Sequence, residues 1–183
     1  MKEDLHGQLM HLLTIGSAKI LIDQAACLLQ AHTELVEHCF SLVNEAHSPV
    51  NWRAAWVLSV YFDAPEVEVS PYIHQVVSAL TSKQKAGIRR AMLHILIPNV
   101  QYLGIHTGVV LESAYSILFD TSSSIAERGY SMHLLNLITQ HVPDLREEYV
   151  LTLHMLSQQT EGSMRKLIHK ILNNRNQLKY NQN

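Results

Sequence analysis

Apolar residues recur along most of the chain at the three- and four-residue spacing that places side chains on one face of an α-helix. Strand-like alternation of apolar and polar residues is rare. Proline and glycine interrupt the pattern at short intervals, so the sequence predicts an all-α chain of about ten helices joined by short loops. The predicted helices span residues 2–13, 17–31, 33–45, 49–62, 70–82, 84–97, 108–119, 124–141, 144–157 and 161–177.

Several of these helices begin with residues that suit a helix N-terminus. Ser48-Pro49 and Ser70-Pro71 each place a capping hydroxyl before a proline at the first helical position. Ser124–Glu127 has the spacing of a capping box, in which the two side chains satisfy each other's backbone amides. Pro143-Asp144 opens a helix whose first turn is acidic, as the positive end of a helix dipole favours.

The second helices of successive pairs contain related segments. They are Trp52–Leu58, Ile88–His94, Glu127–Met132 and Arg165–Leu172, and their arginines lie about 36 to 38 residues apart, or twice that. A helical pair cannot bury its apolar faces alone, whereas stacked pairs share one core. This period therefore predicts a right-handed α-α superhelix of about five helical hairpins. We expect residues 1–177 to form a single domain and residues 178–183 to form a frayed tail.

The segments Trp52–Leu58 and Gly87–Leu93 resemble the start of the second helix in the HEAT/armadillo-like repeat family, and the resemblance covers residues 17–175. It implies a solenoid fold and says little about function. The chain is also similar to small bacterial HEAT-like proteins of unknown function that automated naming has sometimes called adenylosuccinate lyase. That lyase has a flexible Ser-rich loop with Met-Pro, Lys and Asn at set positions, which Ser122–Glu127 lacks. The chain is also far too short for the lyase fold.

Charge is scarce and histidine is plentiful. Only 16% of residues are charged, the formal net charge is -2, and there are 12 histidines. The balance argues against a general nucleic-acid binder, although it does not exclude nucleic acid. The low charge fraction also suggests that another chain covers an apolar end or face, so self-association is one expectation. Because histidine titrates near pH 6.5, we expect association or solubility to change between about pH 7 and pH 5.

The sequence shows no signal peptide and no run long enough to span a membrane, so we expect a cytoplasmic protein with no membrane contact. Cys27 and Cys39 both fall in apolar-periodic segments outside any Cys-x-x-Cys pair. They predict two buried free thiols in a reducing compartment.

Basic residues recur near the start of the second helices and form the first candidate site. The candidates are Arg53, Arg89, Arg90, Arg128 and Arg165, and Lys166 follows the last of them. One interpretation is a ladder of guanidinium groups that binds an acidic or phosphorylated partner on a concave face. The other is structural, with each arginine paired to an acid or a carbonyl of a neighbouring repeat.

Trp52 and Trp56 lie four residues apart on one predicted helix face, where they form either an aromatic binding platform or part of the core. The sequence contains no zinc motif of the His-Glu-x-x-His type, no phosphate-binding glycine loop and no nucleophile motif. It therefore predicts no catalytic residue, no metal site and no cofactor.

These observations favour a non-enzymatic scaffold that binds a protein or peptide through Trp52, Arg53, Trp56 and the other arginines. The alternative is a HEAT-like DNA alkylation-repair glycosylase or a DNA-binding relative. In that alternative Trp52, Trp56, Asp63 and Arg89 or Arg90 would be the functional residues, and the net charge of -2 argues against it.

Overall fold

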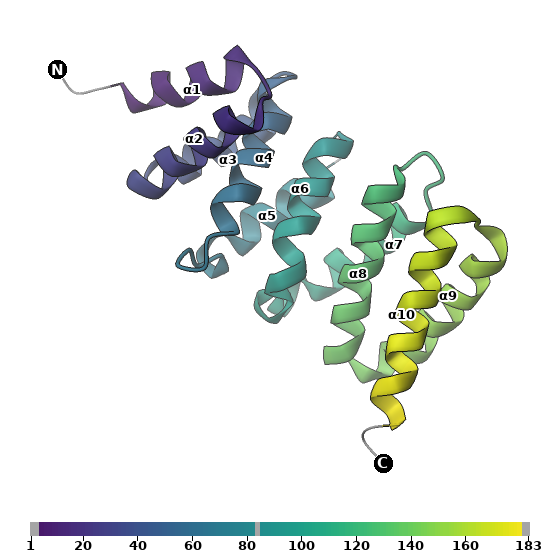
Figure 1. Ribbon diagram of the computed structural model, residues 1–183. Coiled ribbons are helices and arrows are strands. Elements are labelled where there is room, and N and C mark those ends of the chain that lie inside the picture. Colours follow the sequence, from purple (N-terminus) through teal and green to yellow (C-terminus); the bar gives the residue numbers. More distant parts are fainter. Residues whose placement is uncertain (1–3, 83–84, 181–183) are drawn as a thin grey trace. The chain divides into compact units, whose positions relative to one another are not determined.

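The computed structural model describes residues 4–82 and 85–180, and over these ranges it holds ten α-helices, four short 3-10 helices and no strand (Figure 1). The α-helices are α1 (Leu5–Ile15), α2 (Lys19–Ala31), α3 (Leu35–Glu45), α4 (Val50–Phe62), α5 (Ile73–Thr81), α6 (Ala86–Leu96), α7 (Thr107–Phe119), α8 (Ile125–His141), α9 (Arg146–Gln159) and α10 (Gly162–Tyr180). The 3-10 helices are η1 (Ser70–Tyr72), η2 (Ile97–Tyr102), η3 (Gly104–His106) and η4 (Pro143–Leu145). Each predicted helix is present to within a few residues, which confirms the all-α helical-repeat fold.

The chain divides into two compact units, Met1–Ser113 and Ala114–Asn183, with the boundary inside α7. The single domain expected over residues 1–177 stays a prediction. The last helix runs past that limit to Tyr180, so the first three residues of the expected tail are helical. Residues 181–183 of that tail lie outside the described residues, as do residues 2–3 and 84 at the expected starts of two helices.

In the first unit, α4 is the central helix. It packs against α2 on one side and α6 on the other, while α3 covers α4 and α5 covers α6. Ala54, Ala55, Val57 and Leu58 of α4 are fully buried. The two alanines allow close helix approach, and burial of each larger apolar side chain contributes about 1.5–3 kcal/mol. The small residues that follow the arginine of the repeat thus lie in the core.

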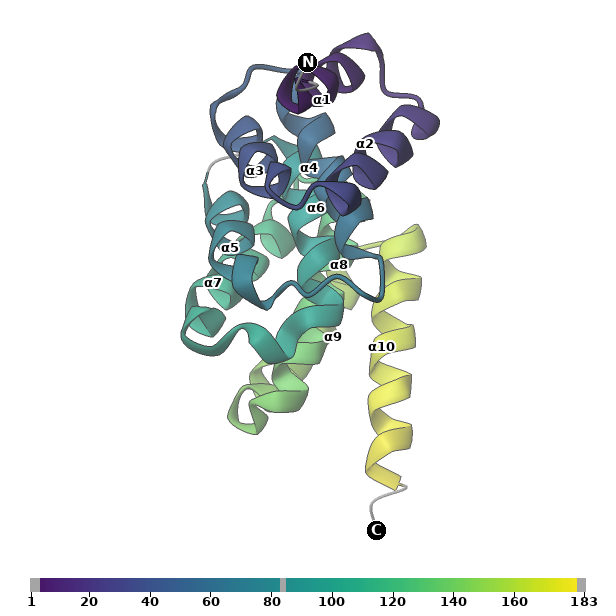
Figure 2. The same cartoon turned by 90° about the vertical axis from the view of Figure 1, so that its left-hand side faces the viewer.

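In the second unit, α10 packs against α9 and α8 (Figure 2). Gly129 of α8 faces α10 closely, since a Cβ added there would lie 3.3 Å from Leu167 Cδ2. Tyr149 of α9 is fully buried, and its hydroxyl donates to the carbonyl oxygen of Met132 at 2.7 Å. A buried tyrosine needs such a partner because an unpaired hydroxyl in the core is costly.

The expected helix starts are correct at Ser124 and wrong at both Ser-Pro pairs. The capping box is present, with Ser124 accepting from the Glu127 amide and Glu127 accepting from the Ser124 amide. The N-cap of α4 is Pro49 itself and makes no side-chain cap, so Ser48 does not cap the helix. Ser70 begins η1 and donates to the Glu68 carboxylate instead. At both sites the serine and the proline lie together in a turn that precedes the α-helix.

Buried thiols are expected at both cysteines, and that expectation is wrong for Cys27. Cys39 is fully buried, whereas Cys27 is exposed on α2. The buried face of α2 carries Ile22, Ala25, Ala26 and Leu29. Position 27 follows two core residues directly, and one residue advances a helix by about 100°, so its side chain points away from that face.

Candidate functional site

Two tryptophans stand at the surface of α4. Trp52 and Trp56 are the third and seventh residues of the helix, and both side chains are half-buried. Their rings stack at a centroid distance of 6.3 Å with an interplanar angle of 19°. The guanidinium of Arg53 lies 5.5 Å from the centroid of the Trp52 ring, within the range of a cation–π contact. The pair is neither core nor fully exposed.

Helix α6 runs beside α4 in the same direction and completes this surface. Near the start of both helices, a Cβ on Gly87 would lie 3.4 Å from Trp52 Cβ. Near their ends, His94 Nε2 lies 2.9 Å from Asp63 Oδ1. Gly87, Arg90 and His94 are spaced by three and four residues and share one face of α6. Arg90 therefore shares the face of α6 that carries the Gly87 contact to Trp52 and the His94 contact to Asp63.

The two charged residues Arg90 and Asp63 differ in whether another side chain binds them. Arg90 is exposed and makes no hydrogen bond or ion pair with any residue that the structure describes. Asp63, the acid of the glycosylase alternative, is held by the His94 ring. The sequence singled out Arg90 and Asp63 separately. No local signal pointed to the His94 contact, which joins two segments 31 residues apart.

Four arginines occupy equivalent positions in four helices. Arg53, Arg89, Arg128 and Arg165 are each the fourth residue of their helix, in α4, α6, α8 and α10 respectively. Arg90 is the residue after this position. The structure thus places Arg128 in register with Arg89, which sharpens the repeat that the sequence showed.

Three of these arginines bind carbonyl groups at the C-terminal end of another helix. Arg53 Nη1 donates to the Leu13 carbonyl at 2.8 Å and to the Thr14 carbonyl at 3.2 Å, in the last turn of α1. Arg128 Nε donates to Leu118 of α7 at 2.8 Å, and Arg165 Nε donates to Ser157 of α9 at 2.9 Å. The last four carbonyls of a helix have no partner within it, and a cation there also meets the negative end of the dipole. The structural interpretation of the ladder therefore describes Arg53, Arg128 and Arg165.

The predicted binding residues fall into two groups. One group lies on the surface of α4 and α6 and consists of Trp52, Arg53, Trp56 and Arg90. Arg89, one residue before Arg90, is half-buried and already interacts with other residues. Arg128 and Arg165 belong to the second unit. The surface in the first unit, named the α4–α6 surface, comprises Trp52, Arg53, Trp56, Asp63, Arg90 and His94.

Metal ligands are not clustered in the described part of the chain, where no group of three or more His, Cys, Asp or Glu residues is placed to hold a metal ion. None of the described helices is both long enough and apolar enough to cross a membrane. The thiol of Cys39 is buried with its Sγ atom 3.5 Å from the Ala54 carbonyl oxygen, and this burial raises its pKa.

Comparison with known proteins identifies the repeat. The family model described as the HEAT repeat domain matches residues 9–175, which is most of the chain. No curated protein and no solved structure matches the chain. The comparison therefore identifies the family and names no partner.

Proposed function

Since the chain belongs to the HEAT repeat domain family, we propose that it is a non-enzymatic binding module that holds a segment of a partner protein on the α4–α6 surface. Stacked helical pairs present extended surfaces that repeat proteins use for binding. The single observation that carries the proposal is the stacked, half-buried Trp52–Trp56 pair on α4, with Arg90 on the neighbouring α6 as a cation without a partner in the described residues.

The residue types at this surface define the partner's chemistry. Tryptophan and arginine are among the residues that most often dominate binding energy at protein interfaces. An apolar side chain of the partner would cover the exposed part of the two indoles and remove it from water. A carboxylate one or two residues away would pair with Arg90. We therefore expect a short segment in which an acidic residue lies close to a large apolar one.

The arginines that bind helix-end carbonyls keep further N–H donors. A guanidinium has five N–H donors, and Arg53, Arg128 and Arg165 use one or two each on helix-end carbonyls. The other donors of Arg53 are proposed to contact the partner on the α4–α6 surface, whereas those of Arg128 and Arg165 are proposed to make binding contacts within the second unit. A cytoplasmic location and self-association remain part of the same proposal.

The test uses the two tryptophans as reporters, since the chain has no others. A library of displayed peptides is selected on the full chain, and the enriched peptide is titrated against it while tryptophan emission is recorded. We expect an enriched sequence with an acidic residue near an apolar one, and a shift of emission to shorter wavelength as the indoles lose water. Trp56→Ala and Arg90→Ala should each weaken binding by about tenfold, as truncation of central interface residues does.

Lys19→Ala is the matched control, because Lys19 is an exposed cation of the same unit that pairs with Asp23 on α2. Its affinity for the peptide should stay within about twofold of the wild type. The proposal is wrong if no enriched peptide changes tryptophan emission, or if Arg90→Ala and Lys19→Ala bind it equally well.

A further inference from the structure

Helix α10 contains more lysines and arginines than any other α-helix in the described ranges. Five of the 14 lysines and arginines lie within Gly162–Tyr180, together with His169, and no aspartate or glutamate does. The net charge of the chain is -2, yet the charged residues of this helix are all basic. The repeat predicts Arg165 and Lys166 as candidates, but the absence of acidic residues between Glu161 and Tyr180 is the stronger signal.

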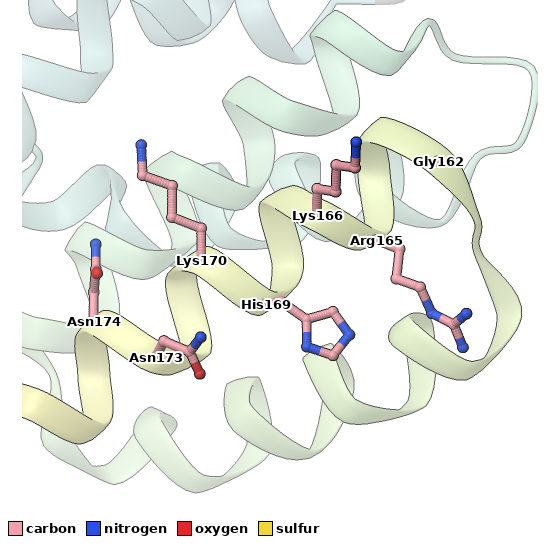
Figure 3. Close-up of a pocket in the computed structure, with 7 residues that line it drawn as sticks. All are labelled: Gly162, Arg165, Lys166, His169, Lys170, Asn173 and Asn174. Carbon is pink, nitrogen blue, oxygen red and sulfur yellow. The ribbon is translucent and has the colours of Figure 1, made fainter.

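The charged side chains line one open hollow along this helix. The hollow has a volume of about 640 Å³, and its polar lining comes from α10 alone (Figure 3). Two rows follow the helix: Arg165, His169 and Asn173 form one, and Lys166, Lys170 and Asn174 form the other. Figure 3 shows Lys166 and Lys170 pointing to one side of the helix, and Arg165 and His169 to the other.

The spacing within each row is regular. Four residues of α-helix rise by about 6 Å. Successive side chains of one face of an extended peptide lie two residues apart, at about 6.6 Å. The cations of a row therefore match acidic side chains at alternate positions of an extended segment, and each row ends in an asparagine amide that can donate to the same segment.

These cations lack acidic partners. Lys166, His169 and Lys170 are exposed and make no ion pair with any residue in the described ranges, and Arg165 is bound only through Nε to the Ser157 carbonyl. The charge of Lys170 reaches α8, where it adds to the effect of burial in lowering the pKa of His133. Charge that is not neutralised locally remains available to a ligand.

The residue types that line the hollow favour an acidic protein segment over a membrane or a nucleic acid. A membrane-binding helix needs apolar side chains beside its cations, and the hollow is lined only by Gly162 and the six polar residues of the two rows. A single-stranded nucleic acid needs aromatic rings for its bases, and none lines this face. A long duplex would also meet the net negative charge of the rest of the chain, whereas a short segment feels mainly the cations within about 8 Å.

We propose that this face of α10 is a docking surface for an acidic segment of a partner protein, whose carboxylates pair with Arg165, Lys166 and Lys170. Arg165 supplies a planar guanidinium suited to a carboxylate, and the two lysines supply point charges along the neighbouring row. The surface is separate from the α4–α6 surface and does not depend on the proposed function of that surface.

The test measures binding of a fluorescein-labelled peptide in which glutamate alternates with serine, using the full chain and fluorescence anisotropy. The wild-type protein should bind this peptide and should not bind the same peptide with glutamine in place of glutamate. Lys166→Gln combined with Lys170→Gln should weaken binding by about tenfold, since exposed ion pairs contribute little singly and act together here. The affinity should also fall as salt is raised.

Lys19→Gln combined with Lys85→Gln is the matched control, because it removes two exposed cations outside α10 and changes the net charge equally. This variant should bind the acidic peptide within about twofold of the wild type. Equal losses in the two double variants would show a response to net charge alone and would overturn the proposal. So would absence of binding, or tighter binding of duplex DNA or of phosphatidylserine vesicles that depends on Lys166 and Lys170.

Discussion

The Nη1 atom of Arg53 lies 2.8 Å from the carbonyl oxygen of Leu13, which joins the first turn of α4 to the last turn of α1 across 40 residues of sequence. The same nitrogen also reaches the Thr14 carbonyl at 3.2 Å. Both carbonyls belong to the last turn of α1, where the helix backbone offers no donor. Arg53 thus holds the end of the first described helix to the centre of its unit.

Replacing this arginine should loosen α1. We expect Arg53→Ala to lower the free energy of unfolding by about 1.5–3 kcal/mol, because a charged hydrogen bond to a part-buried carbonyl is lost. Arg90→Ala removes the same side-chain type from an exposed position and should change stability by less than about 0.5 kcal/mol. Urea unfolding followed by circular dichroism measures both. Equal stability of the two variants would contradict the role given to Arg53.

The capping box at the start of α8 supports a second prediction. Ser124 and Glu127 satisfy each other's backbone amides, and Glu127 is 1% exposed. Ser124→Ala should destabilise the protein by about 1 kcal/mol, while Ser124→Asn should restore most of the loss because asparagine is also a good N-cap. Thermal unfolding of the three proteins checks this order. A wild-type melting temperature for Ser124→Ala would rule out a stabilising cap.

The helices were predictable because their signals are local. Apolar spacing, prolines and the capping box each act within a few residues, and the ten α-helices of the described ranges follow from them. The prediction at the two Ser-Pro pairs was wrong because the local signal is ambiguous. Serine before proline is compatible with a helix cap and with a turn equally well. In the structure both Ser-Pro pairs lie in turns that precede an α-helix, and the hydroxyl of Ser70 donates to the Glu68 carboxylate.

The sequence was enough to predict which residues form the candidate site, but not how these residues contact one another in space. The repeat pointed to Arg53 and Arg165, but whether each binds a ligand or a carbonyl depends on which helix end lies within reach. The contact between Asp63 and His94 joins two segments that are distant in sequence, and no motif in either segment predicts it. The basic face of α10 was visible in composition, yet the exposure of Lys166 and Lys170 depends on how α10 packs on α8 and α9.

The two cysteines should differ sharply in reactivity. Burial raises the pKa of the Cys39 thiol, so little thiolate forms and reagents do not reach it, whereas Cys27 is exposed on α2. A thiol reagent should therefore label one cysteine in the native protein and both after denaturation. Cys27→Ser should abolish the native labelling. Rapid labelling of Cys39 in native Cys27→Ser would contradict the packing of α3 against α4.

A histidine pair between α1 and α3 should make stability depend on pH. The rings of His6 on α1 and His38 on α3 lie 4.5 Å apart, and the Nε2 atom of His38 is buried with no hydrogen-bond partner in the described structure. Burial lowers the pKa of His38, the charge of His6 lowers it further, and Glu45 acts in the opposite direction. The folded protein therefore resists a proton that the unfolded chain accepts near pH 6.5.

This difference fixes the direction of the pH effect. The contribution of His38 to stability is fully present above about pH 6.5 and is lost as the pH falls below it, because the unfolded state then binds more protons. The urea midpoint of the wild type should drop between about pH 7.5 and pH 5.5. His38→Gln should show a smaller drop, since glutamine does not titrate. His11→Gln, which changes an exposed histidine on the same helix as His6, should behave as the wild type. If His38→Gln loses as much stability on acidification as His11→Gln, the pH response arises elsewhere in the chain.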